Sequence, residues 1–262
     1  DRFGEVQASL HAQLNALLRD LDTSDAAAVD AAAEQVAGWF RTVEVAETLS
    51  AAVHQAVSDL QAPFLAVRSS SAAEDSANNS FAGQLETYLY VPPAQVVDRI
   101  RDCWASAYGA RVLAYAKARG ADLRNQQVAV VVQAMVDSEC AGVLFTAHPT
   151  GPLDELVIVA GFGLGEGIVG DQVATDTYTW DRRTGVWIEE VSHKTQKVVL
   201  DNERGGATCL AEVAKGKRDQ PVLDPVRRQT LADLALRIEK ATGHYVDVEW
   251  AYDAAGDLHI TQ

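Results

Sequence analysis

AVRSSSAAEDSANNSFAGQLETYLYV, residues 66–91, is the stretch of this sequence that says most about its fold and its chemistry. An apolar run leads into Arg68 and predicts that this residue stands at the end of a short strand. A guanidinium group held there can donate two parallel hydrogen bonds to phosphate oxygens. The polar loop that follows, residues 69–80, is rich in Ser, Ala and Asn, so its backbone N–H groups can approach a phosphate closely. Gly83 adds a bare backbone position and Thr87 a hydroxyl, although the pattern alone also fits an Arg68 that forms a surface ion pair.

Helices are predicted before this stretch and directly after it. Apolar residues recur at helical spacing throughout residues 1–60, which indicates three helices that pack through their apolar faces. Residues 84–91 alternate like a strand, and Pro92 and Pro93 end it. Residues 94–119 then read as one long helix.

The second half of the chain changes from helical to strand periodicity. Its apolar runs predict strands within residues 128–133, 141–146, 155–160, 178–180 and 186–199, and a closing hairpin of residues 245–252 and 258–261. One amphipathic helix is predicted at residues 224–243. Helices followed by strands and hairpins favour an α+β fold over a doubly wound parallel sheet.

The composition is that of an ordinary globular protein with an acidic balance. The 262 residues include 22 Lys+Arg and 37 Asp+Glu, which gives a formal net charge of -15. No Lys- or Arg-rich stretch is present, so a nucleic-acid partner is not expected. No apolar run approaches the roughly 20 residues of a membrane span, and the first residues lack the pattern of a signal peptide. The 3 cysteines form no CxxC pair, which favours a reducing, cytoplasmic location.

The closing hairpin carries two carboxylates that suit a metal ion. Asp247 and Glu249 are two residues apart, so on a strand their side chains point to the same face. Mg²⁺ prefers one or two carboxylates together with the phosphates of a substrate. The alternative is a pair of solvated acids on an edge strand.

Residues 66–91 resemble the VRSSATAED…FAGQ…TY signature of the ATP-binding domain of the pyruvate, phosphate dikinase family, which includes phosphoenolpyruvate synthase and rifampin phosphotransferase. Three further segments resemble the family in the same order: VVVQAM at 130–135, AGVLFTAHPTG…VAGFGLGEG at 141–167, and YVDVEWAYDAAGDLHITQ at 245–262. The resemblance implies an ATP-grasp fold, in which two α+β subdomains hold ATP between them. It also implies a helical N-terminal part, residues 1–66, and a nucleotide-binding core, residues 67–262.

The resemblance implies roles for individual residues as well. Arg68 would contact the phosphates as one of two catalytic residues, the other being Glu249. The loop and strand that cover the phosphates would include Gly83, Thr87 and Tyr88. The adenine pocket would be lined by Gln133, Met135 and Val136. The phosphate end of ATP and its Mg²⁺ would be held by Glu249 and Gln262, with Asp247 as a second carboxylate.

The glycine-rich segment, Lys194 and three histidines are weaker candidates for site residues. GFGLGEG, residues 161–167, lacks the GxGxxG spacing, and no βαβ unit follows it, which argues against a Rossmann site. It predicts a tight turn near the nucleotide, with Glu166 either behind the site or at the surface. Lys194 is a weak candidate for a phosphate contact. No phosphocarrier is expected among three histidines: His148, His193 and His259.

In the family, ATP passes its β-phosphate to a His of a separate swivelling domain and leaves as AMP and phosphate. That domain then serves a small-molecule acceptor, such as pyruvate or an antibiotic. The resemblance therefore implies a fragment of a multidomain dikinase-type phosphotransferase that uses ATP and Mg²⁺. The family's leading Lys-Gly segment has no counterpart in residues 1–60, which contain no Lys, and its trailing Ser-Arg-Pro segment is expected beyond Gln262. Two alternatives are an ATP-dependent condensing or ligase-type relative in natural-product biosynthesis and a non-catalytic nucleotide-binding module.

Overall fold

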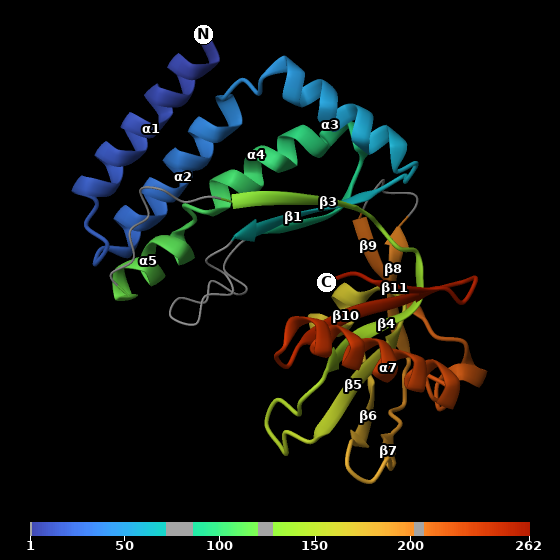
Figure 1. Ribbon diagram of the computed structural model, residues 1–262. Coiled ribbons are helices and arrows are strands. Elements are labelled where there is room, and N and C mark those ends of the chain that lie inside the picture. Colours follow the sequence, from blue (N-terminus) through green and yellow to red (C-terminus); the bar gives the residue numbers. More distant parts are fainter. Residues whose placement is uncertain (1, 72–85, 120–127, 202–206) are drawn as a thin grey trace. The chain divides into compact units, whose positions relative to one another are not determined.

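Both halves of the chain combine helices with antiparallel strands, which confirms the predicted α+β class (Figure 1). The structure is a computed structural model and describes residues 2–71, 86–119, 128–201 and 207–262. It divides into two units, Asp1–Met135 and Val136–Gln262. The boundary expected between residues 66 and 67 stays a prediction.

The first unit opens with the three predicted helices, α1 (Arg2–Asp20), α2 (Ala26–Thr42) and α3 (Glu47–Asp59). Asp25 caps α2, because its side chain accepts hydrogen bonds from the N–H groups of Ala27 and Ala28. Among the described residues of this helical part, two neighbouring apolar clusters include Leu14, Val29, Val36, Tyr108 and Leu113.

The prediction of one long helix over residues 94–119 is wrong. The segment forms a 3₁₀ turn, η1 (Pro93–Gln95), and two helices, α4 (Val96–Ser106) and α5 (Ala110–Arg119). Ser106 donates its hydroxyl to the carbonyl of Cys103 at 2.7 Å, and such local side-chain bonds compete with helix continuation. Gly109 follows three residues later, and its N–H donates to the carbonyl of Ser106 in a turn at 3.0 Å.

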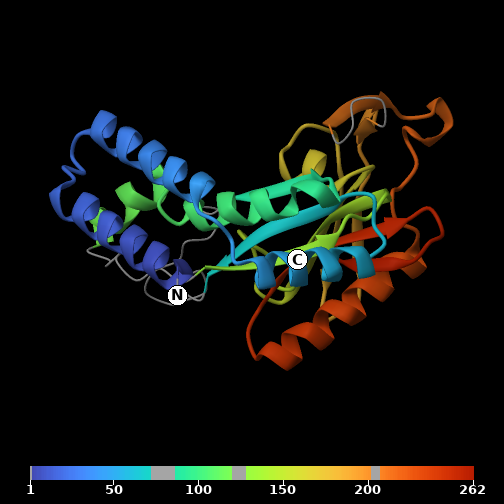
Figure 2. The same cartoon turned by 90° about the horizontal axis from the view of Figure 1, so that it is seen from above.

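A three-stranded antiparallel sheet completes the first unit, in the order β2 (Thr87–Val91), β1 (Leu65–Ser71), β3 (Val128–Ala134). Helix α4 packs on one face of this sheet (Figure 2), where Leu65 and Val67 are fully buried. The expected strand end at Arg68 is wrong, because β1 continues to Ser71, which pairs with Val128. Arg68 therefore lies in the middle of the central strand, held by neighbours on both sides.

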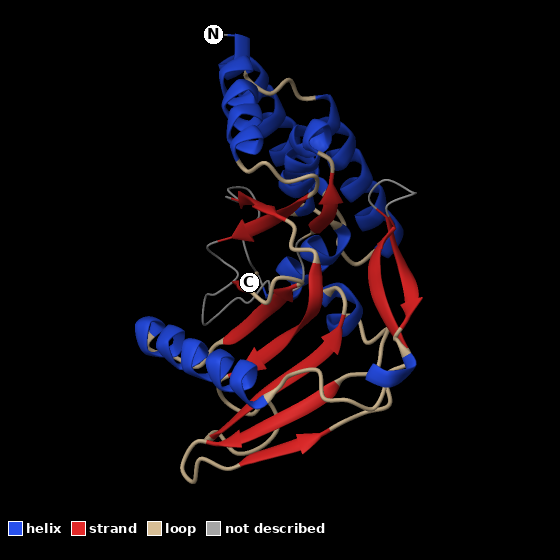
Figure 3. Cartoon of the chain, turned by 90° about the vertical axis from the view of Figure 1, so that its right-hand side faces the viewer, coloured by secondary structure: helices blue, strands red, loops and turns tan. Residues whose placement is uncertain are grey.

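The second unit is built on a six-stranded antiparallel sheet in the order β11-β10-β4-β5-β6-β7. Its strands are β4 (Ser138–Phe145), β5 (Glu155–Phe162), β6 (Asp176–Asp181), β7 (Trp187–Glu190), β10 (Asp247–Asp253) and β11 (Leu258–Ile260). Helix α7 (Pro225–Thr242) lies along one face (Figure 3), where Trp250, Tyr178 and Leu231 form the core. Gly142 is required on this face, since a Cβ atom there would stand 1.9 Å from the carbonyl oxygen of Val159.

Residues 186–199, which the sequence predicts as strand, divide between two sheets. After β7 the chain leaves the large sheet, and β8 (Gln196–Asp201) pairs with β9 (Ala207–Glu212), a strand that the sequence did not indicate. This two-stranded ribbon stands beside the large sheet (Figure 3). It touches the turn after β5, where Gly163 adopts a φ of +84° against the carbonyl of Val198. The helix α6 (Gly165–Val169) begins there, and η2 (Lys215–Lys217) follows the ribbon.

Candidate functional site

In the first unit, three of the predicted site residues share the sheet face that α4 does not cover. Arg68 pairs with Thr87 on β2 and with Val131 on β3, and Gln133 pairs with Ala66. Paired residues of antiparallel strands project from the same face, and Ala66 and Arg68 are two apart on β1. The pairing therefore brings Arg68, Thr87 and Gln133 onto one face. Thr87 is exposed and Arg68 half-buried, so a polar ligand can reach this face.

Tyr88 projects from the opposite face. It pairs with Val67, and both belong to the apolar cluster beneath α4. The guanidinium of Arg99 lies 5.2 Å from the centroid of its ring. Burial, and after it the charge of Asp102, raise the pKa of Tyr88 to about 12, so its phenol stays protonated. A contribution of Tyr88 to a nucleotide site is thus expected from its backbone, not its side chain.

The remaining predicted residues of this part fall elsewhere. Gly83 lies outside the described residues. Met135 is the last residue of the first unit and Val136 the first of the second. The N–H of Met135 donates to the carbonyl of Phe64 at 3.1 Å, which extends the pairing of β3 with β1 by one residue beyond Ala134.

In the second unit, the structure confirms that Asp247 and Glu249 share a face of β10. They pair with Phe145 and Val143 on β4, whereas Val248 and Trp250 between and beyond them are buried against α7. Asp247 is exposed and Glu249 half-buried. The two carboxylates thus lie on the face of the sheet away from α7.

Gln262 is brought beside Glu249 by its backbone. The N–H of Glu249 donates to the carbonyl of Gln262 at 2.9 Å, and the N–H of Thr261 donates to the carbonyl of Glu249 at 2.9 Å. Two carboxylates and an amide oxygen are hard donors of the kind that Mg²⁺ takes together with phosphates and water. Among the described residues no three acidic, His or Cys side chains form a cluster. This donor set therefore fits Mg²⁺ that is also held by a substrate, and not an all-protein cage.

Comparison with known proteins shows the family of the chain. Residues 3–262 match the family described as pyruvate phosphate dikinase, AMP/ATP-binding domain. The chain belongs to this family. Membership of a family described as AMP/ATP-binding supports ATP as the nucleotide.

Three relatives illustrate the similarity. A probable phosphoenolpyruvate synthase of Methanothermobacter thermautotrophicus is 34% identical over 253 residues, 94% of this chain and 36% of the relative. The phosphoenolpyruvate synthase of Pyrococcus furiosus is 35% identical over 260 residues, 94% of this chain and 32% of the relative. The prodigiosin synthesizing transferase PigC of Serratia marcescens is 40% identical over 190 residues, 71% of this chain and 21% of that protein. The dikinase-type domain thus spans about a third or less of the length of these relatives.

The glycine-rich segment of the domain forms a turn and the short helix α6. Glu166 on this helix accepts a hydrogen bond from the hydroxyl of Thr208 on the ribbon at 2.5 Å. Leu164 donates its N–H to the carbonyl of Val198 at 2.9 Å. The segment therefore joins the large sheet to the ribbon, and the predicted place of this turn near the nucleotide stays a prediction.

Lys194 does not present its ammonium group to a ligand. Its side chain is 1% exposed and lies 2.5 Å from Asp176, whose side chain is 0% exposed. The ammonium group also donates to the carbonyl of Ser192 at 2.8 Å. The sequence did not reveal this buried ion pair, because nothing in SHKTQK distinguishes a buried lysine from a solvated one.

Three of the 6 histidines, those considered from the sequence, have partners within the domain. His148 accepts the N–H of Thr150 at 3.2 Å, His193 lies 2.6 Å from Asp219, and His259 lies 2.9 Å from Asp253. The expectation that none of the three is the phosphocarrier stays a prediction.

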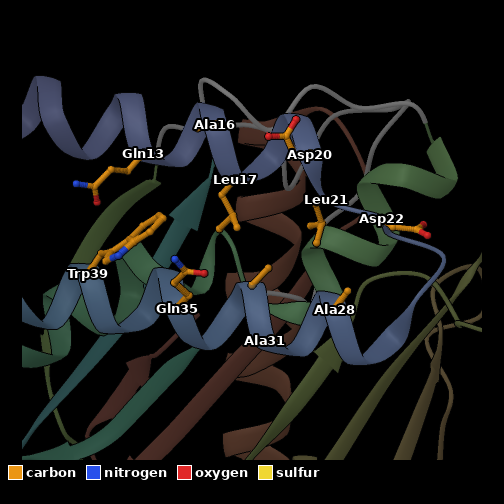
Figure 4. Close-up of a pocket in the computed structure, with 11 residues that line it drawn as sticks. Gln13, Ala16, Leu17, Asp20, Leu21, Asp22, Ala28, Ala31, Gln35 and Trp39 are labelled. Atoms are coloured by element: carbon orange, nitrogen blue, oxygen red, sulfur yellow. The ribbon is translucent and has the colours of Figure 1, made fainter.

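An open cavity of about 710 Å³ lies between α1 and α2 (Figure 4). Leu17, Leu21 and Trp39 line it together with Asp20 and Asp22. Its lining contains no cationic side chain, so the cavity does not suit a triphosphate. None of the predicted site residues lines it.

No helix among the described residues combines the length and the apolar character needed to cross a bilayer.

Proposed function

We propose that this domain binds Mg²⁺-ATP as the nucleotide-binding part of a dikinase-type phosphotransferase. The proposal rests on two groups of polar residues, each gathered on one face of a sheet. Arg68, Thr87 and Gln133 share the face of one sheet that lies away from α4, and Asp247 and Glu249 share the face of another that lies away from α7. A chain with a cationic, hydrogen-bonding face and an acidic, metal-binding face has both groups that a nucleoside triphosphate needs.

The roles of the residues follow from their chemistry. Arg68 donates from its planar guanidinium to phosphate oxygens, and Thr87 offers a hydroxyl beside it. Gln133 with Met135 and Val136 lines the adenine site, and the backbone around Gly83 and Tyr88 covers the phosphates. Asp247, Glu249 and Gln262 hold Mg²⁺, which neutralises charge on the phosphates when bound. Positioning and charge stabilisation are the main contributions that a protein makes to phosphoryl transfer.

The proposal includes the ATP-grasp architecture and the division into residues 1–66 and 67–262. It also includes the reaction: the β-phosphate passes to a His of a separate swivelling domain, AMP and phosphate leave, and a small-molecule acceptor such as pyruvate or an antibiotic is phosphorylated. The similarity to phosphoenolpyruvate synthases, which are longer than this chain, supports it. A cytoplasmic location fits such a reaction.

The test is to incubate the full-length protein with ATP and Mg²⁺ and to separate the nucleotide products. We expect AMP and phosphate, and we expect Arg68→Ala to weaken ATP binding by about tenfold or more, since hydrogen bonds to charged groups contribute about 1.5–3 kcal/mol. Arg111→Ala is the control, because Arg111 is an exposed arginine of α5 in the same unit. ADP as the sole product would refute the dikinase reaction. Unchanged ATP binding in Arg68→Ala would refute the assignment of the phosphate site.

The similarity to prodigiosin synthesizing transferase PigC favours a second candidate. A condensing relative in natural-product biosynthesis would use the same nucleotide site to activate a small molecule. In that case the full-length protein would consume ATP only when two condensation partners are present, and no phosphorylated acceptor would accumulate. A non-catalytic nucleotide-binding module would bind ATP without converting it under either condition.

A further inference from the structure

The pairing of β4 with β10 ends in an irregular way, directly before the strand that carries the acidic pair. In a regular hydrogen-bonded antiparallel pair, two residues exchange both of their backbone bonds. Here the N–H of Thr146 donates to the carbonyl of Val246 at 3.0 Å, as expected. The return bond differs, because the N–H of Val246 donates to the side-chain hydroxyl of Thr146 at 2.9 Å. A hydroxyl thus replaces a carbonyl at the last rung.

The carbonyl of Thr146 is used by an arginine instead. The Nη1 atom of Arg182 donates to it at 3.0 Å. The same guanidinium forks onto Glu239 of α7, with Nη1 to Oε2 at 3.2 Å and Nη2 to Oε1 at 2.9 Å. The side chains of Arg182 and Glu239 are 26% and 18% exposed, and Thr146 is 0% exposed. A bidentate pair of this kind is specific in geometry and is little screened by solvent.

We infer that Thr146, Arg182 and Glu239 form a clamp that positions the acidic pair of β10. Val246, which the clamp holds through two hydrogen bonds, is the residue directly before Asp247. Strand ends fray unless they are tied down, and Asp247 is the first residue of its strand. The clamp ties this end to β4, to the turn after β6 and to α7. The inference rests on the proposed function, in which Asp247 and Glu249 hold Mg²⁺ with ATP.

The hydrogen bonds described above for Thr146, Arg182 and Glu239 do not reach the acidic pair. They are therefore positioning residues and not catalytic ones. Residues that hydrogen-bond directly to a metal's ligands typically cost about 10–100-fold in metal affinity when they are replaced. The clamp acts on the carboxylates only through Val246, so it predicts a loss of Mg²⁺ affinity at the lower end of this range, about tenfold, without any change in the carboxylates themselves.

The experiment compares the full chain with Thr146→Val and Arg182→Gln. The first readout is the Mg²⁺ concentration that gives half-maximal ATP binding, measured by calorimetry at fixed ATP. The second is amide hydrogen exchange of residues 246–249. Both variants are expected to need about tenfold more Mg²⁺ and to exchange faster. Glu239→Gln keeps the shape of the side chain and replaces Arg182→Gln in this test if that variant does not fold.

Two control variants separate positioning from general stability. Thr146→Ser keeps the hydroxyl and is expected to behave like the wild type. Arg218→Gln removes an arginine at the base of the ribbon that likewise contacts one carbonyl and one carboxylate. These are the carbonyl of Val213 at 2.9 Å and Glu212 at 3.2 Å. It is expected to leave the Mg²⁺ requirement unchanged.

The outcomes distinguish the inference from the proposed function. If the wild type binds Mg²⁺-ATP and the clamp variants need no more Mg²⁺ than Arg218→Gln, the inference is overturned and the function stands. If the wild type binds no ATP at any Mg²⁺ concentration, the proposed function is refuted and the inference falls with it.

Discussion

Replacing Lys194 by methionine is expected to destabilise the second unit by about 3–5 kcal/mol, the usual cost of leaving one partner of a buried ion pair behind. The structure explains this magnitude. The ammonium group of Lys194 lies 2.5 Å from Asp176, and the two side chains are 1% and 0% exposed. Methionine fills a similar volume, so the change removes the positive charge without opening a large cavity.

Asp176 would keep its other donors but not its counter-charge. Its carboxylate accepts the N–H of Ser192 at 3.0 Å, the N–H of Val222 at 2.8 Å and the hydroxyl of Tyr178 at 3.1 Å. These bonds satisfy its lone pairs and hold three segments of the chain together. The uncompensated buried charge is therefore the main source of the expected loss.

Lys217 provides a matched control. Its ammonium group lies 5.9 Å from the centroid of the Phe162 ring, the same distance as that of Lys194. Its carboxylate partner is Glu139 at 3.1 Å, but the side chains are 58% and 37% exposed. Lys217→Met is expected to cost less than about 1 kcal/mol, as is usual for exposed ion pairs.

The assay is urea unfolding of the chain at neutral pH, followed by circular dichroism and by tryptophan fluorescence. The double variant Asp176→Asn, Lys194→Met should be more stable than Lys194→Met alone, because both charges are then absent. A loss below about 1 kcal/mol for Lys194→Met, equal to that of Lys217→Met, would refute the reasoning. A double variant less stable than the single one would refute it as well.

Two further predictions concern the large sheet. Gly142→Ala should destabilise the chain by about 1–3 kcal/mol or more, because its Cβ atom would stand 1.9 Å from the carbonyl oxygen of Val159. Urea unfolding measures this loss of stability. An unfolding midpoint equal to that of the wild type would contradict the close approach. Burial raises the pKa of Glu239, but its bonds to Arg182 and Thr146 outweigh this and hold the pKa below the ordinary value of 4.5. Its ionised form therefore stabilises the fold above that ordinary value, and the contribution is lost as the pH falls through the lowered pKa. Glu239→Gln should accordingly destabilise the chain at neutral pH and much less in acid, and a loss that does not shrink in acid would contradict the pKa direction.

Elements of local periodicity could be predicted from the sequence. The three N-terminal helices, the strands of the large sheet and helix α7 all follow from spacing that is visible within a single segment. The failures arise where a few local bonds override that spacing. Ser106 and Gly109 interrupt a continuous helical pattern, and Ser69 to Ser71 read as a loop although they pair along β3. Serine is compatible with both a loop and a strand, so only the presence of the neighbouring strand decides between the two.

The candidate site was predictable to the extent that its geometry is local. Asp247 and Glu249 share a face because they are two apart on one strand, and no other part of the chain is needed to show it. The orientation of Tyr88 was not predictable in this way, since β2 is irregular where it pairs with β1 and only the register with Val67 reveals which face it occupies.

The supporting groups of the site are set by contacts between distant parts of the sequence. Arg182 and Glu239 are 57 residues apart, and Val246 and Thr146 are 100 apart. Each of these residues taken alone is an ordinary surface or strand residue. Their function arises only when the fold brings a strand end, a turn and a helix to one point. The proposed ligand pair can thus be predicted from two positions on a strand, whereas the residues that hold this strand in place are found only from the tertiary structure.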